Sequence, residues 1–237
     1  MPLVSQAVGD TLVLKNIGRN FALFVAAFLA LLLAGFWIPY FSGVPHFEPG
    51  ITAAVHVHAA ALFGWAALML VQPLAVYGRA YRLHRVLGTL SLALMSLVVL
   101  SSIAMLHKEF QERIQAGASL SAALKGEYLS AAQLSLVGLA YAGSIVAARR
   151  RKIGVHWRLM LCVVLLLMPA GLARTLGYWF DVPQATSQGV CIAINLLLLG
   201  ALALHDVRAH QDRAIYGYTL AAYIPVVAAW AILGRPV

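Results

Sequence analysis

The sequence predicts an all-α fold, a polytopic integral membrane bundle of seven transmembrane helices that forms a single domain over residues 1–237. Three observations predict it. Of the 237 residues, 62% are hydrophobic and only 11% are charged, which is too little charge for a water-soluble domain. Seven apolar runs are each long enough to cross the ~30 Å hydrocarbon core as a helix. The positive charge also gathers in alternate connections, as in inserted membrane proteins.

The seven predicted spans follow one another through short connections. The first has a partly amphipathic segment before it and no small-residue cleavage site, so we interpret it as a retained span and not as a signal peptide. The longest connection, residues 107–127, lies on the predicted outer side. The spans cover about residues 21–41, 52–77, 86–106, 129–148, 157–179, 187–205 and 215–233.

The distribution of Lys and Arg predicts the orientation, with the N-terminus inside and the C-terminus outside the bacterial cytoplasmic membrane. Of the 17 Lys and Arg residues, 12 fall in inner segments under this assignment. The net charge of +9 therefore orients the chain in a lipid bilayer, and we expect no nucleic-acid partner. The inner residues are Lys15, Arg19, Arg79, Arg82, Arg85, Arg149, Arg150, Arg151, Lys152, Arg158, Arg208 and Arg213.

The positions of the acidic residues and cysteines restrict the classes of function that the sequence supports. No Asp or Glu falls inside a predicted span, which argues against a proton-coupled transporter or a carboxylate-based intramembrane hydrolase. Cys162 and Cys191 both fall inside spans and are interpreted as small packing residues.

Two histidines stand near the start of the second span, in "AAVHVHAAALFGWAALMLVQPL". At about 100° per residue, His56 and His58 point about 200° apart, so a regular helix does not aim both at one ligand. Steps of seven residues from His58 reach Trp65 and Gln72 on nearly the same face. His58 is therefore the inward candidate, as a cofactor or metal ligand or as an interhelical hydrogen-bond partner.

Arg174 is the one cation well inside a predicted span. It follows His156 by 18 residues, about five helical turns, so the two share a face at opposite ends of the fifth span. Arg174 thus falls near the outer boundary, at about the depth of His58. It is a candidate to bind a propionate, a quinone carbonyl or an anionic substrate; the structural alternative is snorkelling or pairing with Asp181.

On the inner side, "LHRVLG" and "VHWRLM" each place a histidine at the start of an outward-running span, followed closely by an arginine. If these spans are neighbours, His84 and His156 lie at equal depth with Arg85 and Arg158 at the rim. Bis-imidazole ligation of haem requires one nitrogen on each side of the iron and cations for the propionates. The alternative is that these residues only satisfy the charge asymmetry. His205, Asp206 and His210 could add ligands, but we expect them in the solvated loop.

The order of these motifs resembles a family of uncharacterised bacterial multi-pass membrane proteins. The resemblance covers roughly residues 50–213 and rests on "HVHAAALFGWAALMLVQPL", an H-R-x-L-G, an H-x-R-L-M followed by an arginine, and "HDVRAHQDR". It implies no particular reaction. The positions it implies are His58, His84, Arg85, His156, Arg158, Arg174 and Asp206.

More distant resemblances point to haem. Cytochrome b561-type electron carriers take haem ligands from their third and fifth spans, where His84 and His156 stand here. Their other haem uses histidines of spans two and four, and the fourth span here contains none. Haem- and copper-linked proteins of the NnrS type carry H-x-H-x-x-x-F-G, which "HVHAAALFG" resembles with one additional residue.

The leading hypothesis is therefore a membrane redox protein, a possible oxidoreductase component, that binds b-type haem. His84 and His156 would be the axial ligands, and Arg85 and Arg158 the propionate partners. His58 and Arg174 would form an outer site for haem, a metal or a quinol, and a quinol or a protein would donate electrons. The alternative is a non-catalytic sensor, carrier or assembly protein with structural or metal-binding histidines. A zinc-dependent hydrolase ranks last, and the sequence leaves a homo-oligomer open.

Overall fold

Seven α-helices make up almost all of the described chain, which confirms the all-α fold. The computed structural model describes residues 2–47, 50–209 and 214–233, with side-chain environments from residue 15 onward. Each helix contains a stretch long and apolar enough to cross a bilayer, so the protein is an integral membrane protein. The elements are α1 (Pro2–Trp37), the 3-10 turn η1 (Phe41–Gly43), α2 (Ala53–Tyr77), α3 (Tyr81–Gln115), α4 (Leu120–Arg149), α5 (Ile153–Phe180), α6 (Gln184–Arg208) and α7 (Ile215–Leu233).

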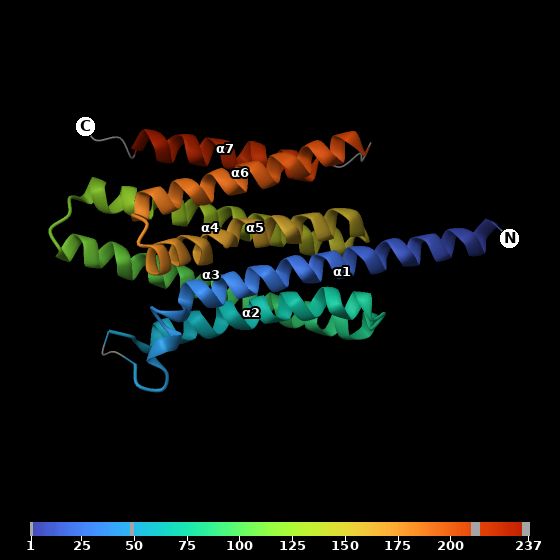
Figure 1. Cartoon of the computed structure of the whole chain (residues 1–237), viewed down its shortest axis with the longest axis horizontal. Coiled ribbons are helices and arrows are strands. Elements are labelled where there is room, and N and C mark those ends of the chain that lie inside the picture. The colour runs from blue at the N-terminus through green and yellow to red at the C-terminus, as the bar shows by residue number, and fades with distance from the viewer. Residues whose placement is uncertain (1, 48–49, 210–213, 234–237) are drawn as a thin grey trace.

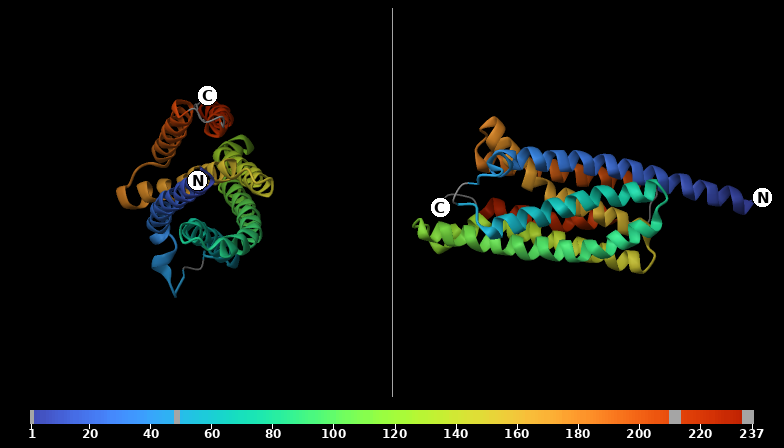
Figure 2. Two further views of the ribbon diagram at one scale, coloured as in Figure 1. Left: turned by 90° about the vertical axis from the view of Figure 1, so that its right-hand side faces the viewer. Right: turned by 90° about the horizontal axis from the view of Figure 1, so that it is seen from below.

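The helices form one elongated bundle, with the start of α1 and the end of α7 at opposite ends of it (Figure 1). Consecutive helices pack side by side, and α5 also packs on α1, so that α1–α5 close a five-helix ring. Helices α6 and α7 cover α5 and α4 from outside this ring, as the end-on view in Figure 2 shows. Within the described residues, α3 and α5 make no backbone contact, because they lie across the ring from each other.

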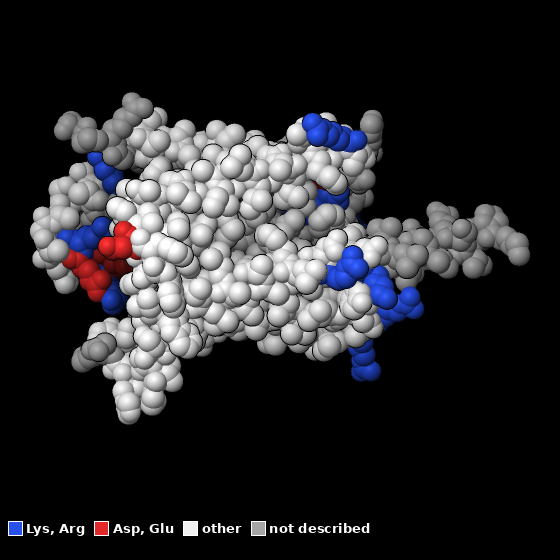
Figure 3. Space-filling view, in the orientation of Figure 1, with Lys and Arg blue, Asp and Glu red and all other residues white. Residues whose placement is uncertain are grey.

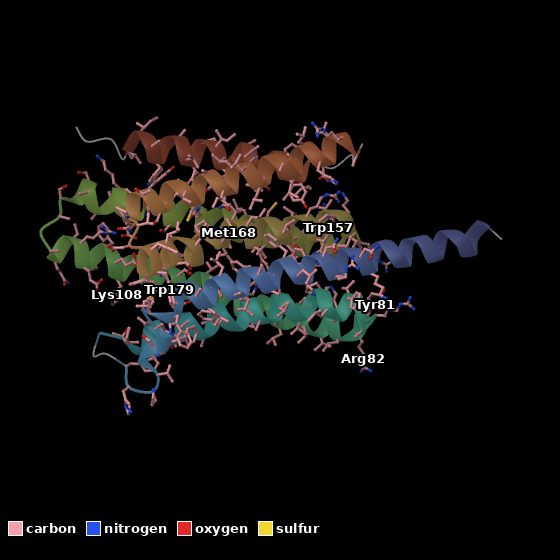
Figure 4. The ribbon with its side chains drawn as sticks, in the orientation of Figure 1. Tyr81, Arg82, Lys108, Trp157, Met168 and Trp179 are labelled. Carbon is pink, nitrogen blue, oxygen red and sulfur yellow. The ribbon has the colours of Figure 1, made fainter. Side chains whose placement is uncertain are left out.

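Charge divides the bundle along its length. Lys and Arg gather at the end that carries the α2–α3 and α4–α5 turns, and the middle of the visible face is almost free of charged residues (Figure 3). We call this end, with residues 78–80 and 150–152, the basic end. The other, with residues 116–119 and 181–183, is the far end. Figure 4 places Tyr81, Arg82 and Trp157 at the basic end and Lys108 and Trp179 at the far end. Aromatic and basic residues at both ends of an apolar band are typical of a membrane protein.

The connection between α3 and α4 is much shorter than predicted. The sequence predicts a connection over residues 107–127 that could contain a short surface helix, but α3 continues to Gln115 and α4 begins at Leu120. Ion pairs stabilise these additional turns: Lys108 contacts Glu112 at 2.6 Å within α3, and Arg113 contacts the buried Glu127 of α4 at 2.8 Å. The polar composition of this segment predicts a connection without a span. Ion pairs within α3 and between α3 and α4 stabilise helices there instead.

The core confirms the predicted inward face of α2. Trp65 is fully buried and Gln72 is 8% exposed, and both lie on the stripe that His58 begins. Trp65 packs in the same cluster as a continuous buried run on α5, Cys162–Leu166. Large side chains on the outer surface remain exposed to the lipid, where apolar contact has no cost; they include Leu100, Leu139 and Leu197.

Helices α1 and α5 approach each other most closely where two glycines meet. A Cβ atom added to Gly35 would collide with the backbone carbonyl of Gly171, and one added to Gly171 would lie 3.0 Å from the carbonyl oxygen of Leu31. Small residues let membrane helices pack backbone to backbone, which is the main source of helix association in lipid. This crossing closes the five-helix ring.

We predict that Gly35→Ala destabilises the protein by about 1–3 kcal/mol, the usual cost of overpacking. The added methyl group would have to displace the backbone of α5. Thermal unfolding in detergent micelles measures the effect. Gly138→Ala on α4 is the matched control, because nothing lies within 4 Å of its added Cβ. Equal unfolding temperatures for the two variants would show that the crossing is not tight.

Candidate functional site

A cavity of about 450 Å³ lies inside the five-helix ring at the basic end. All five helices of the ring contribute to its lining, and most of that lining is apolar. We call it the ring cavity. Its size falls in the range of pockets that hold cofactors and small molecules. Its polar or ionisable lining residues are Gln72, His84, Arg85, Thr89, Ser91, Arg149, His156 and Trp157.

The ring cavity brings together the two histidines at the inner starts of α3 and α5. The ring centres of His84 and His156 are 6.4 Å apart, with the ring planes at 81°. The two imidazoles meet in a T-shaped arrangement, although the backbones of α3 and α5 do not meet. The structure therefore brings His84 and His156 together, although the two helices that carry them are not neighbours.

His156 is held in one tautomer by α4. Its Nδ1 lies 2.8 Å from the Ser144 Oγ and 3.1 Å from the Ser144 carbonyl oxygen, which only accepts hydrogen bonds. Nδ1 therefore carries the proton of the neutral ring, and the Ser144 hydroxyl donates to the His156 carbonyl at 3.2 Å. The Nε2 lone pair of His156 is consequently available to a ligand.

His84 is held by Gln72 from α2. The surrounding groups assign the orientation of the Gln72 amide, because its oxygen accepts from the Gly88 N–H (2.8 Å) and its nitrogen donates to the His84 carbonyl (3.1 Å). The same nitrogen donates to Nδ1 of His84, which places the ring proton on Nε2. The two histidines are thus in opposite tautomers, one presenting a donor and the other an acceptor.

Two arginines are among the lining residues of the ring cavity, and one of them differs from the sequence prediction. Arg85 lines it as predicted, and the second is Arg149, from the end of α4. Arg158 instead points away, toward α6. Its Nε donates to Asp206 Oδ2 at 2.9 Å and its Nη2 donates to Asp206 Oδ1 at 3.0 Å.

The Arg158–Asp206 pair corrects the expectation that Asp206 lies in a solvated loop. Asp206 is 3% exposed inside α6 and was expected in a solvated loop. Arg158 also donates to the Gly154 carbonyl at 3.1 Å and lies 4.5 Å from the Trp157 ring centre. Because both partners are buried and their contact is bidentate, the pair joins α5 to α6 at the basic end.

The other predicted inner ligands do not assemble with Asp206. The side chain of His205 is 77% exposed, and its Nδ1 is 3.9 Å from Asp206 Oδ1. His210 lies outside the described residues. Across residues 15–47, 50–209 and 214–233, no group of three His, Cys, Asp or Glu side chains is arranged to hold a metal ion. The three-ligand zinc site of the hydrolase alternative is therefore not formed there.

His58 and Arg174 come together at the far end, in a separate cavity of about 580 Å³ that we call the far cavity. His58 Nδ1 lies 3.0 Å from the Ser101 Oγ on α3, as the interhelical alternative predicts. His56 turns instead toward the connection after α1, with its Nδ1 2.8 Å from the Tyr40 hydroxyl. Arg174 donates to the Ala170 carbonyl at 2.9 Å and does not pair with Asp181 in the described structure.

The functional argument rests on the geometry of the site, because comparison with known proteins gave no match. No family model, curated protein or solved structure matches this chain. Two cavities toward opposite ends of the bundle, one inside the five-helix ring and one between the ring and α6, therefore carry the functional argument. Along α5, the ring cavity ends at Met160 and the far cavity begins at Leu166, six residues or about 9 Å away.

Sequence reasoning missed three residues of the ring cavity and its surroundings. Arg149 belongs to a run of basic residues that indicates topology and nothing more specific. Ser144 stands 12 residues before His156, and only the α4–α5 turn brings the two together. Gln72 was placed on the inward stripe of α2, but its contact with His84 requires the packing of α2 on α3. The feature of the sequence that could have identified Gln72 is an amide side chain within an apolar span.

We predict that Asp206→Asn destabilises the protein by about 3–5 kcal/mol, because it removes the carboxylate that neutralises a buried guanidinium. Thermal or denaturant unfolding in micelles measures the loss. The double variant Arg158→Met/Asp206→Leu should recover most of it, since an apolar pair removes both buried charges. His205→Asn, at the exposed neighbour, is the control. An Asp206→Asn variant as stable as the control would contradict the role of the pair.

Proposed function

We propose that this protein is an electron-transfer protein of the bacterial cytoplasmic membrane that binds one b-type haem in the ring cavity. One observation carries the proposal: two histidines from helices across the ring, with their ring centres 6.4 Å apart, line one cavity together with two arginines. Metal–imidazole bonds of about 2.0 Å on each side of one ion place two ring centres about 6 Å apart. The basic end would face the cytoplasm.

The residues of the ring cavity suit this group chemically. His84 and His156 would supply the axial nitrogens, and Arg85 and Arg149 would pair with the propionates. The apolar remainder of the lining would exclude water from the macrocycle. When bound, b-type haem supplies a one-electron redox centre.

The hydrogen-bond partners of the two histidines would set their basicity. Ser144 already holds His156 in the tautomer that a metal requires. His84 reaches that tautomer when its proton moves to Nδ1 and the Gln72 amide rotates by 180°, so that the Gln72 oxygen accepts from Nδ1. Outer hydrogen bonds of this kind orient a ligating imidazole and strengthen it as a donor.

A carrier is the second candidate function. It is favoured by the placement of two cavities toward opposite ends of the bundle, with about 9 Å of packed residues between them along α5. A carrier would shift this packed layer to expose one solute to each side in turn. It would bind its solute without acquiring the visible spectrum of a haem protein.

We predict that the full-length protein, purified from haem-replete cells, shows a Soret band and one haem per chain. His84→Ala and His156→Ala should each reduce the haem content at least tenfold, because each removes one axial nitrogen. His205→Ala, an exposed histidine at the same end, should leave the content unchanged. A colourless preparation, or a double His84→Ala/His156→Ala variant with an unchanged spectrum, would overturn the proposal.

Gln72 tests the tautomer argument separately. Gln72→Glu presents only acceptors to Nδ1, so we predict a more basic His84 and a lower reduction potential in spectroelectrochemical titration. Gln72→Leu removes the hydrogen bond and should weaken haem retention about 10–100-fold. Gln111→Glu, at an exposed position of α3, controls for added charge. If neither Gln72 variant differs from the parent protein, Gln72 does not orient His84.

A further inference from the structure

The far cavity is the larger of the two and is not used by the proposed haem site. Its lining comes from α3, α4, α5 and α6, with His58 from α2, so it lies between the five-helix ring and α6. It is also more polar than the ring cavity. Among its lining residues are one guanidinium, one carboxylate and three glutamine amides: Arg174, Glu109, Gln133, Gln184 and Gln188.

Arg174 uses one of its donors within its own helix. One Nη1 hydrogen bond reaches the Ala170 carbonyl, and the guanidinium carbon lies 4.6 Å from the ring centre of Phe36. Among the described side chains, no carboxylate lies within 4.0 Å of the guanidinium. A guanidinium carries five N–H donors. Arg174 therefore offers hydrogen bonds to an acceptor in the far cavity.

The charges of the far cavity cancel. Glu109, from α3, lines it together with Arg174, so the two formal charges sum to zero. A charged ligand would add an uncompensated charge to a partly apolar cavity, which is costly. An uncharged ligand with oxygen acceptors would avoid this cost and would still engage the guanidinium.

The amides of Gln133 and Gln188 add both donors and acceptors. The Gln133 nitrogen donates to the Tyr223 hydroxyl of α7 at 3.0 Å. The Gln133 oxygen is a further hydrogen-bond acceptor in this lining residue. Gln188 takes part in no recorded hydrogen bond within the described structure. The lining thus suits a head group that carries carbonyl or hydroxyl oxygens.

The far cavity also changes in polarity along its depth. It extends over α5 from Leu166 to Tyr178, which are 12 residues or about 18 Å apart. Its deep end is apolar, formed by Val137, Leu166 and Ile192, whereas Glu109 and Gln184 lie at the far end of the bundle. A molecule with a polar head and an apolar body matches this gradient.

We propose that the far cavity binds an uncharged, lipid-soluble molecule whose oxygen-bearing head group lies beside Arg174, Gln133 and Gln188, with its apolar body extending toward the middle of the membrane. A membrane quinone and a neutral glyceride share this chemistry. The inference does not depend on haem, because the two cavities are separate.

Thermal-shift titrations of the purified full chain test the proposal. A short-tailed ubiquinone and monooleoylglycerol are the two neutral probes, and oleate is the anionic counterpart. We expect a saturable rise in unfolding temperature with at least one neutral probe and a weaker response to oleate. A response to the quinone alone identifies a redox ligand, and a response to the glyceride alone identifies a lipid site. No saturable response to either neutral probe, or tighter binding of oleate, would overturn the proposal.

Two cavity variants locate the binding. Gln188→Leu removes an amide that makes no side-chain hydrogen bond within the described structure. Ala173→Leu fills part of the far cavity. Both variants should therefore fold. Each should raise the apparent Kd of the neutral probe at least tenfold, whereas Gln111→Leu on the exposed face of α3 should not. Equal binding by all three variants would overturn the assignment. Haem content in the same variants reports on the ring cavity independently, so failure of one proposal is distinguishable from failure of the other.

Discussion

The close crossing of α1 and α5 at Gly35 and Gly171 is the contact on which the rest of the structure depends. In lipid, apolar side chains gain little by leaving their surroundings for another helix, so association needs tight packing and polar contacts. Here the two backbones meet because neither residue has a side chain at the crossing. Once α5 is fixed against α1, the intervening helices must form a ring, and α3 is held opposite α5.

That ring explains why the ring cavity exists at all. Its five helices surround more space than side chains fill at the basic end, whereas Trp65, Met69 and Leu165 fill it in the middle. The result is a cavity at one end and a packed layer beyond it. The far cavity arises outside the ring, where α6 leans on α5 and α3 stays apart from α6. Both cavities therefore follow from which helices touch and which do not.

Ion pairs between helices stabilise the arrangement in addition to apolar packing. Arg158 and Asp206 join α5 to α6, and Arg113 and Glu127 join α3 to α4 at the opposite end. These contacts direct two arginines away from the cavities, which leaves Arg85 and Arg149 at one and Arg174 at the other. Among the described residues, the positions of two buried carboxylates, Asp206 and Glu127, thus divide the structural cations from the available ones.

The sequence by itself determined the fold class, the number of helices and the inward face of α2. Hydrocarbon requires every backbone group to bond within its own helix, so an apolar run of sufficient length has one outcome. It also identified His84 and His156, because histidines at the starts of two spans are conspicuous. Only the tertiary structure decided what each polar residue meets. Arg149 took the place predicted for Arg158, and Asp206 moved from an expected loop to a buried ion pair, since a partner on another helix is not encoded in local spacing. Such pairings depend on the rotation of each helix and on its neighbours, and these were fixed by packing across the whole bundle.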